Sequence, residues 1–349
     1  MIFASDNWTG ASLQVAEALL VAAGGHAPAY GGDPLTAEVG AAMSRLFERE
    51  IAVFFVGTGT AANALALAHV ARPAGVVFCH RMAHIATDEA GAPEFLSGGS
   101  RLHAIEGAKG KLTPEALEAA IRLYPPQAVF HGQPAAVSIS QLTEAGTAYA
   151  ASEVAAIADV AKAAGLPLHM DGARFANAVV GLGVSPADIT WRAGVDMLSF
   201  GGSKNGCFAA EAVVFFDPEK ARGFDFQRKR AGHVFSKSRF IAAQFAAYLA
   251  RDHWLELARH ANAMARQLAD GIETSAEARL ALTPDGNEVF AFLSRAADQR
   301  LKSAGALYYP WPASGLGVAE PGEDDILVRL VTSFRTVPGE IDQFIGLID

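Results

Sequence analysis

Leu-Ser-Phe-Gly-Gly-Ser-Lys-Asn-Gly, residues 198–206, is the stretch on which the interpretation of this chain depends. An apolar run that reads as a buried strand ends here, two glycines bend the chain, and Lys204 follows. Burying a lysine is costly, so a lysine at the end of a core strand needs a reason. A Schiff base is one reason, because the amine must leave bulk solvent to condense with a carbonyl. A surface lysine on a turn would produce the same pattern, so other stretches must support this hypothesis.

The stretch Leu168–Arg174 begins with a second short apolar run, which ends at the carboxylate of Asp171. Arg174 follows three residues later. Pyridoxal 5′-phosphate (PLP) withdraws electrons well only while its pyridine nitrogen stays protonated, and a carboxylate against that nitrogen keeps it so. Arg174 would pair with Asp171 or with the phenolic oxygen of the cofactor. The plain structural alternative is a helix N-cap aspartate with a salt-bridged arginine.

A third stretch, Val56–Asn63, joins an expected strand to an expected helix over residues 61–70. Backbone N–H groups at such a helix N-terminus can hold a phosphate. The string also satisfies G-x-G-x-x-A, but a dinucleotide site needs an acidic residue about 20 positions later, and Val77–Met82 has none. The hydroxyl groups of Thr58 and Thr60 favour a single phosphate monoester.

Two histidines, His80 and His84, are four residues apart. That spacing can place two metal ligands on one helix face, but the glutamate of H-E-x-x-H is missing and no third ligand is evident. One imidazole lying over a cofactor ring is the better functional interpretation. A core or surface histidine is the alternative.

The composition limits the class of protein. With 349 residues, 51% of them hydrophobic, the chain has room for one large and one smaller domain. The net charge of −9 argues against nucleic-acid binding. Two cysteines, Cys79 and Cys207, cannot build a disulfide framework, so a reducing compartment fits. Neither a signal peptide nor an apolar stretch of about 20 residues is evident. We therefore expect a cytoplasmic protein without nucleic-acid or membrane partners.

Short apolar runs alternate with helical patterns through the first two thirds of the chain. Strands interleaved with helices predict a mainly parallel sheet covered on both faces, with ligands beyond the carboxyl ends of its strands. The expected strands are residues 52–56, 75–79, 128–131, 166–170, 195–200 and 212–216. Ser152 is expected to cap a following helix.

The pattern changes near residue 240. A long helical stretch over 238–270 is expected to break near residues 251–252 and to stop at Gly271, and Pro338 is expected to open a terminal helix. This predicts a large PLP-binding domain over residues 1–240 and a small α+β domain over residues 241–349, with the N-terminal residues as candidates to pack against the small domain. Its expected strands are residues 288–293, 306–311 and 326–332.

Taken together, these motifs resemble the low-specificity L-threonine aldolases of the β-eliminating lyase group, and in particular their phenylserine aldolase-like branch. The resemblance covers nearly the whole chain, and its most specific strings are His169–Arg174 and Ser199–Gly206. It implies the fold-type I architecture of PLP-dependent transferases, an α/β fold. In that fold, helices sandwich a mainly parallel seven-stranded sheet and a smaller α+β C-terminal domain follows. Further matches are Ser5-Asp6, Tyr30–Pro34, Ala83-His84, Asp88–Ala92 and Val328–Thr332.

The resemblance implies a role for each matched residue. Lys204 would carry PLP, Asp171 would hold the pyridine nitrogen, and Arg174 would neighbour the 3′-oxygen. An arginine fork suits the substrate carboxylate better than a lysine would. The remaining implied roles are Thr58, Gly59 and Thr60 for the phosphate, His84 over the ring, Ser5 and Arg329 for the substrate carboxylate, and Tyr30 and Lys229 at the neighbouring subunit's site in a homodimer or homotetramer.

The chain departs from the commoner family pattern in two places. Many members have Glu-Asn-Thr-His after the fifth strand, where this chain reads Ser140–Thr143, and the segment Ala231–Phe235 also differs. Both departures suit the phenylserine aldolase-like branch and leave the base that acts on the substrate hydroxyl open. His84, or a water that it positions, is the candidate, with His131 and His233 as unplaced substitutes.

The resulting hypothesis is a PLP enzyme that cleaves threonine, allo-threonine or phenylserine into glycine and an aldehyde. A β-eliminating lyase or an aminotransferase would use the same cofactor and would release pyruvate and ammonia from serine, or exchange amino groups. A non-catalytic PLP-fold binding protein is a third interpretation. The intact set of Lys204, Asp171 and Arg174 argues against it, because nothing about stability requires that set.

Overall fold

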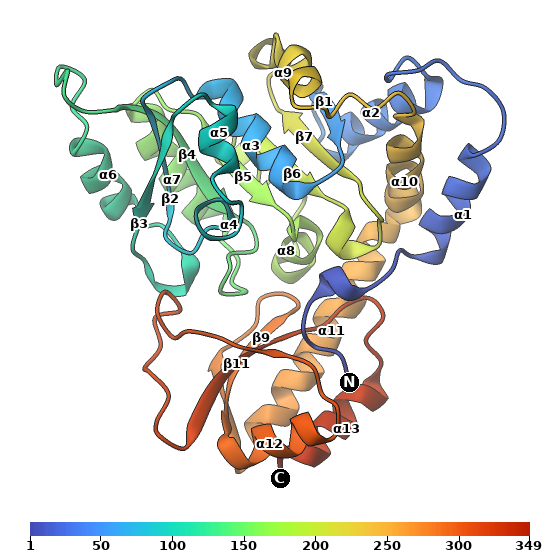
Figure 1. Ribbon diagram of the computed structural model, residues 1–349, viewed down its shortest axis with the longest axis vertical. Helices are drawn as coiled ribbons and strands as arrows, with labels where there is room; N and C mark the ends of the chain where they lie inside the picture. Colours follow the sequence, from blue (N-terminus) through green and yellow to red (C-terminus); the bar gives the residue numbers. More distant parts are fainter.

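A computed structural model describes residues 1–349, and it contains two sheets, one above the other in Figure 1. The upper, seven-stranded sheet has the order β1-β7-β6-β5-β4-β2-β3, and the lower, four-stranded sheet has the order β10-β11-β9-β8. The predicted fold class is confirmed. The strands are β1 (Ala52–Val56), β2 (Gly75–His80), β3 (Arg101–Ile105), β4 (Gln133–Ser140), β5 (Leu168–Gly172), β6 (Met197–Gly201), β7 (Glu211–Phe215), β8 (Ala278–Leu282), β9 (Glu288–Ser294), β10 (Tyr309–Pro310) and β11 (Asp325–Val331).

The strand directions bring the functional motifs to one edge of the large sheet. The ladder β3-β2-β4-β5-β6 is parallel, and β7 runs against both β6 and β1. The strand β1 therefore points the same way as β6. The carboxyl ends of β1, β2, β4, β5 and β6 lie along a single edge, which is where ligands of such sheets bind.

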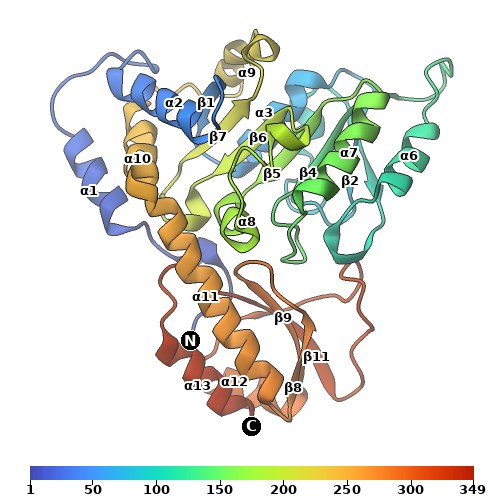
Figure 2. The ribbon, with the colours of Figure 1, turned by 180° about the vertical axis from the view of Figure 1, so that it is seen from behind.

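Helices cover both faces of this sheet. Figure 1 shows α3 in front of it, and Figure 2 shows α2, α7, α8 and α10 on the opposite face. The helices are α1 (Leu13–Ala22), α2 (Pro34–Leu46), α3 (Gly59–Val70), α4 (His84–Thr87), α5 (Ala92–Leu96), α6 (Pro114–Arg122), α7 (Ala151–Ala163), α8 (Phe175–Leu182), α9 (Phe224–Arg230), α10 (Arg239–Leu249), α11 (His253–Thr274), α12 (Arg295–Ser303) and α13 (Pro338–Ile348).

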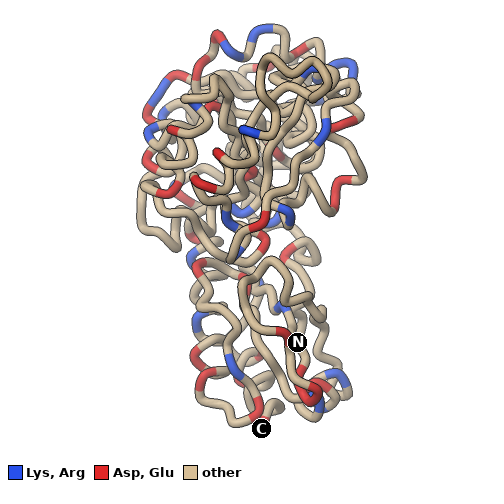
Figure 3. The backbone as a smooth tube through the Cα atoms, turned by 90° about the vertical axis from the view of Figure 1, so that its left-hand side faces the viewer, with Lys and Arg blue, Asp and Glu red and all other residues tan.

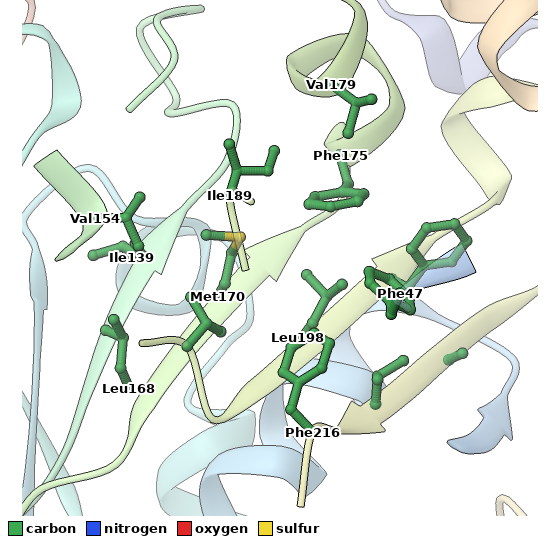
Figure 4. Close-up of a cluster of buried hydrophobic side chains, with 14 of the residues drawn as sticks. Phe47, Ile139, Val154, Leu168, Met170, Phe175, Val179, Ile189, Leu198 and Phe216 are labelled. Carbon is green, nitrogen blue, oxygen red and sulfur yellow. The ribbon is translucent and has the colours of Figure 1, made fainter. Parts of the chain in front are cut away.

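Alternation along the central strands separates the core from the site. Leu168 and Met170 of β5 and Leu198 of β6 point to the face covered by α7 and α8, where Phe175 packs in the largest hydrophobic cluster (Figure 4). Because successive strand residues face opposite sides, Asp171 faces α3 instead. The helix α3 is itself buried along most of its length, which explains its apolar sequence.

Several local expectations differ from the structure. Residues 128–131 form turns, and the strand starts only at Gln133. Helix α7 begins at Ala151 rather than after Ser152, because the Glu153 carboxylate accepts a hydrogen bond from the Ala150 N–H (2.7 Å). The strand expected over residues 306–311 is reduced to two residues.

The long C-terminal helical stretch breaks where predicted. A turn at Arg251 and Asp252, both with positive φ, separates α10 from α11. The helix does not stop at Gly271 but runs on to Thr274. A Cβ on Gly271 would lie 2.6 Å from Ile345 of α13, so this glycine allows close helix packing rather than ending the helix.

The N-terminal residues pack with the four-stranded sheet. The Phe3 N–H donates to the carbonyl oxygen of Leu307 (2.8 Å), and the Val331 N–H donates to that of Phe3 (2.8 Å). The Phe3 ring is fully buried in the hydrophobic cluster that packs against the four-stranded sheet. Residue 240 lies in α10, which packs on α1 and α2. No helix in the structure is both long and apolar enough to cross a membrane.

Candidate active site

Lys204 lies on a short turn, Ser203–Asn205, directly after β6. The buried side chain of Asn205 fixes this turn by donating to Tyr248 Oη (2.8 Å) and to the Trp254 carbonyl oxygen (2.8 Å). The Lys204 side chain is half-buried, and its amine makes no hydrogen bond or ion pair within the chain. The structure therefore holds the lysine backbone firmly and leaves the amine free to react.

Ionisable side chains surround that amine. The charge of Lys204 acts on the pKa values of Asp6, His84, Glu144 and Glu211, so all four lie within electrostatic range. Burial raises the pKa of Glu211 to about 7, while its hydrogen bond from the Ser203 turn and the charge of Lys204 oppose that rise. A lysine among buried acidic groups with shifted pKa values, at the end of a core strand, is a candidate functional residue.

Asp171 lies near the end of β5, on the strand beside the one that leads to Lys204. Its buried carboxylate accepts hydrogen bonds from the Asn63 side chain (2.8 Å) and from the Ala173 N–H (3.0 Å). Asp171 also acts on the pKa values of Glu144 and Glu211, as Lys204 does. The two residues thus share one site.

A hydrogen-bonded chain links Asp171 to His84. Asn63 Nδ2 also contacts Glu89 Oε1 (2.8 Å), and the same oxygen lies 2.9 Å from His84 Nδ1. The Glu89 side chain is fully buried, whereas His84 is 34% exposed. The hydrogen bond with Glu89 raises the pKa of His84, although burial opposes it. Burial raises the pKa of Glu89 itself. The imidazole is therefore fixed through one nitrogen, and one side remains open to the site.

The start of α3 is suited to an anion. Thr58 is the N-cap, and its Oγ1 accepts a hydrogen bond from the Ala61 N–H (3.1 Å). The Thr60 hydroxyl has no partner in the protein, and a Cβ on Gly59 would meet no heavy atom within 4 Å. Open space in front of free N–H groups at a helix N-terminus is the arrangement that binds phosphate.

Arg174 lies in a buried charge cluster with residues from both ends of the chain. It binds Asp6 with two bonds, from Nε (2.8 Å) and Nη2 (3.0 Å), and its Nη1 is 3.3 Å from Glu288. Arg329 Nη1 lies 3.7 Å from the same Glu288, and its guanidinium sits 4.3 Å from the Trp311 ring centre. The two arginines therefore meet at one carboxylate. Figure 3 shows positive and negative segments at the junction of the two parts of the molecule.

The other residues named from the sequence lie in different places. Ser5 caps the turn that carries Asp6, since its Oγ accepts from the Asn7 N–H (3.1 Å). Lys229 Nζ lies 5.1 Å from the ring centre of Tyr30, and neither residue hydrogen-bonds to the Lys204 site. The two residues contact each other, and their role at a neighbouring subunit's site stays a prediction.

The substitute histidines fall outside the cluster. His131 packs against Tyr124, and His233 Nδ1 accepts from the Gly57 N–H (3.4 Å) at the start of the phosphate loop. Sequence reasoning missed several polar residues that the structure adds to the site: Asn63, Glu89, Glu144, Glu211 and Glu288. Glu89 lay inside a matched motif and so had a signal in the sequence. Glu144 had none, because the strand that it follows was expected at residues 128–131 and lies at Gln133–Ser140.

The residues at this edge fit PLP. They offer an amine without a partner, a buried carboxylate, and a helix N-terminus that faces open space. Polar atoms buried at the site also lack partners within the protein, among them Asn63 Oδ1, Glu89 Oε2 and Arg329 Nε. A polar cofactor and a charged substrate would satisfy such atoms.

A cavity lies at the opposite edge of the sheet, away from Lys204 and Asp171. It has a volume of about 970 Å³, and residues that precede β5 and β6, such as Pro167 and Val195, line it. This cavity is thus away from the convergent polar groups. Chemistry, rather than volume, identifies the site.

Comparison with known proteins identifies the family. The family model for beta-eliminating lyases matches residues 3–296. A low specificity L-threonine aldolase of Pseudomonas aeruginosa is 43% identical over 314 residues, which is 90% of each chain. Its counterpart from Pseudomonas sp. (strain NCIMB 10558) is 41% identical with the same coverage.

Solved structures show the same fold. A Leishmania major threonine aldolase superposes with a TM-score of 0.91 at 26% identity, covering 99% of this chain and 98% of that one. Sphingomonas wittichii serine palmitoyltransferase has a TM-score of 0.74 at 15% identity and covers all of this chain and 86% of its own, so it supports the fold alone.

Proposed function

This chain belongs to the beta-eliminating lyase family, and from that premise we propose that it is a PLP-dependent aldehyde lyase. It cleaves L-threonine, L-allo-threonine or a related β-hydroxy-α-amino acid such as phenylserine into glycine and an aldehyde. The observation that carries the proposal is the meeting of an unpartnered Lys204 amine and a buried Asp171 carboxylate at the ligand-binding edge of the sheet. The names of the two Pseudomonas relatives support the reaction.

Each of the site residues has a separate role in holding the cofactor. When bound, PLP supplies an electron sink for the reacting carbon. Lys204 would bind it covalently, Asp171 would keep its ring nitrogen protonated, and Arg174 would neighbour its 3′-oxygen. His84 would lie over the ring, and the sequence names it as a candidate acceptor of the substrate hydroxyl proton. The start of α3, with Thr58, Gly59 and Thr60, would hold the phosphate.

Arg329 and Ser5 are assigned to the substrate carboxylate. Arg174 is committed to Asp6 through two short bonds, whereas Arg329 has only a 3.7 Å contact to Glu288 and an Nε without a partner. Arg329 therefore keeps donors available for an incoming carboxylate. Fixing the carboxylate orients the bond to be cleaved, and orientation supplies much of the rate enhancement.

The assembly completes the proposal. We place the enzyme in the cytoplasm as a homodimer or homotetramer, in which Tyr30 and Lys229 reach the neighbouring subunit's site. Tyr30 is exposed and Lys229 stacks on it, so the pair is available at the surface. An assay of aldehyde release from threonine, allo-threonine and phenylserine stereoisomers would identify the preferred side chain.

Replacement of Lys204 tests the cofactor assignment. Lys204→Ala is expected to abolish the visible absorbance of PLP bound as a lysine Schiff base, together with aldehyde release. Lys162→Ala, an exposed lysine on α7, is the matched control and should keep both. Unchanged absorbance and aldehyde release in Lys204→Ala would end the assignment, and pyruvate from serine in the unmodified protein would point to β-elimination.

A further inference from the structure

Resting on the proposed function, we propose that Glu144 accepts the proton of the substrate's β-hydroxyl while the Cα–Cβ bond breaks. Glu144 follows the stretch Ser140–Thr143, where the chain departs from the commoner family pattern. The proposal makes Glu144 a catalytic residue and leaves His84 to contact the cofactor ring.

The position of Glu144 in the sheet brings it to the reacting groups. It lies four residues beyond β4, and β4 is flanked by β5 and β2. The loop after β5 carries Arg174, and the segment after β2 carries His84. The loop with Glu144 therefore emerges between them, at the edge where substrate binds.

The loop is held rigidly, and Glu144 is the exception within it. Gln141 exchanges two side-chain hydrogen bonds with the backbone of Tyr149, both 2.9 Å. The hydroxyls of Thr143 and Thr147 both donate to the Lys109 carbonyl oxygen (3.0 and 2.7 Å). Every other polar side chain in residues 141–147 thus has a partner, whereas the half-buried Glu144 carboxylate has no hydrogen bond or ion pair. A fixed loop that presents one free carboxylate is preorganised for a ligand.

The small domain closes the other side of this loop. The Asp285 side chain accepts a hydrogen bond from the Ala148 N–H (2.9 Å), and the Asp285 N–H contacts the Gly146 carbonyl oxygen (3.3 Å). A Cβ on Gly146 would lie 3.0 Å from Glu288. These contacts place Glu144 where both parts of the molecule meet the site.

Charged groups from every adjoining element act on Glu144. Burial is the largest influence and raises its pKa; Lys204 and Arg174 oppose that rise, and Glu288 and Asp171 add to it. The pKa of His84 in turn rises in response to Glu144. A carboxylate whose pKa moves toward neutrality is better matched to accept a proton from a hydroxyl group.

His84 is less available than Glu144 as a proton acceptor. Its Nδ1 is engaged by Glu89, and that hydrogen bond raises the pKa of the imidazole. The ring therefore stays cationic over a wider pH range, and a cationic imidazole cannot take a proton. Glu144 remains an acceptor whenever it is ionised.

The step balances without an oxidant or reductant. The hydroxyl proton moves to the Glu144 carboxylate, the Cβ–O bond becomes a carbonyl, and the Cα–Cβ bond breaks. Its electron pair stays with Cα, which later takes a proton to give glycine. Glu144 then returns its proton to solvent.

The substitution Glu144→Gln separates this role from cofactor binding. Aldehyde release, as kcat/KM, is expected to fall by about 100-fold or more, the usual loss for an acid–base group. Exchange of the glycine α-proton in D₂O, followed by NMR, needs no base for a hydroxyl group. Its rate should therefore stay within about threefold of the unmodified protein, a small change beside the loss of aldehyde release. Glu118→Gln, an exposed glutamate on α6, is the control and should change neither rate.

Three further measurements distinguish catalysis from structure. The rise of kcat/KM at low pH should disappear in Glu144→Gln but persist in His84→Asn, and Glu144→Asp should retain more aldehyde release than Glu144→Gln. Because the folded-state pKa of Glu144 is raised, its ionisation weakens the fold as pH increases through that value. Glu144→Gln should therefore melt at the same or a higher temperature than the unmodified protein above that pH.

Several results would overturn the assignment. Aldehyde release retained in Glu144→Gln would exclude Glu144 as the base. Equal loss of aldehyde release and glycine exchange would instead show a role in binding. An unmodified protein that exchanges the glycine α-proton but releases no aldehyde from any of the three substrates would refute the proposed function itself.

Discussion

His84 illustrates how a single buried neighbour changes the chemistry of a residue at the site. Its imidazole is partly exposed, yet Glu89, which is fully buried, holds Nδ1 at 2.9 Å. Asn63 in turn holds Glu89 and Asp171, so orientation passes along side chains from three elements. We infer that Glu89 is a positioning residue, because it acts on the site through His84 and Asn63.

The substitution Glu89→Gln is expected to lower the pKa of His84, because the largest cause of its rise is removed. A raised folded-state pKa stabilises the protein below the unfolded value of about 6.5, and that contribution disappears as pH rises through the folded value. The variant should therefore lose stability mostly in acid. NMR titration of the histidine ring signals measures the shift, with Asp88→Asn, the exposed neighbouring carboxylate, as control. An unchanged His84 titration would contradict this account.

At the scale of elements, the approach of β5 to β6 places the reactive lysine. The two strands pair in parallel, and the chain bends at Gly201, the last residue of β6, and at Gly202. A Cβ on Gly201 would lie 2.7 Å from the Ala173 carbonyl oxygen. Backbone atoms cannot move aside as a flexible side chain can, so the glycine permits the close contact that positions Lys204.

The substitution Gly201→Ala should therefore destabilise the protein by about 1–3 kcal/mol, as overpacking usually does. It should also weaken PLP binding, because the Lys204 turn must shift. Thermal unfolding and titration of the apoprotein with PLP measure the two effects. Gly346→Ala in α13, where a Cβ meets no atom within 4 Å, is the control. A variant with normal stability and PLP affinity would show that the contact relaxes without cost.

At the scale of the whole molecule, a buried charge cluster joins the N-terminus, the large sheet and the small sheet. Asp6, Arg174 and Glu288 come from three distant segments, and all three are nearly inaccessible to solvent. Asn287 also donates to Asp6 (3.0 Å). Removing one member leaves a buried charge without its partner, which typically costs about 3–5 kcal/mol.

The substitution Asp6→Asn should lower the melting temperature strongly at neutral pH. Burial alone would raise the pKa of Asp6, but the charges of Arg174 and Lys204 and the hydrogen bonds outweigh it and hold the pKa low. Stability from this group is therefore present above the unfolded pKa of about 3.9 and is lost as pH falls through the folded value. The difference in melting temperature between Asp6→Asn and the unmodified protein should therefore become smaller in acid.

Melting curves from pH 3 to pH 8 would test this dependence. Asp188→Asn, which breaks an exposed pair with Arg192, is the matched control and should leave the melting temperature unchanged. A difference that stays constant with pH would mean that packing, rather than charge, accounts for the effect.

The sequence by itself determined five strands of the large sheet (β1, β2, β5, β6 and β7), the break between α10 and α11, and the two most specific motifs. It predicted no strand at Arg101–Ile105, and the strand expected at residues 128–131 was wrong. Lys204 and Asp171 were identified because each directly follows or ends an apolar run, and that pattern is local. Local chemistry also predicted the helix that opens at Pro338, as the structure confirms.

Only the tertiary structure decided which side chains meet. The contact between Asp6 and Arg174 spans 168 positions, and that between Asp6 and Asn287 spans 281. The residues between such partners do not indicate that the partners meet in the fold. Periodicity and spacing along the sequence therefore could not predict these contacts. Glu144 is likewise an ordinary loop glutamate in sequence. Its lack of a partner and its nearness to Lys204 exist only because the strands of one sheet end together and the small domain closes over them.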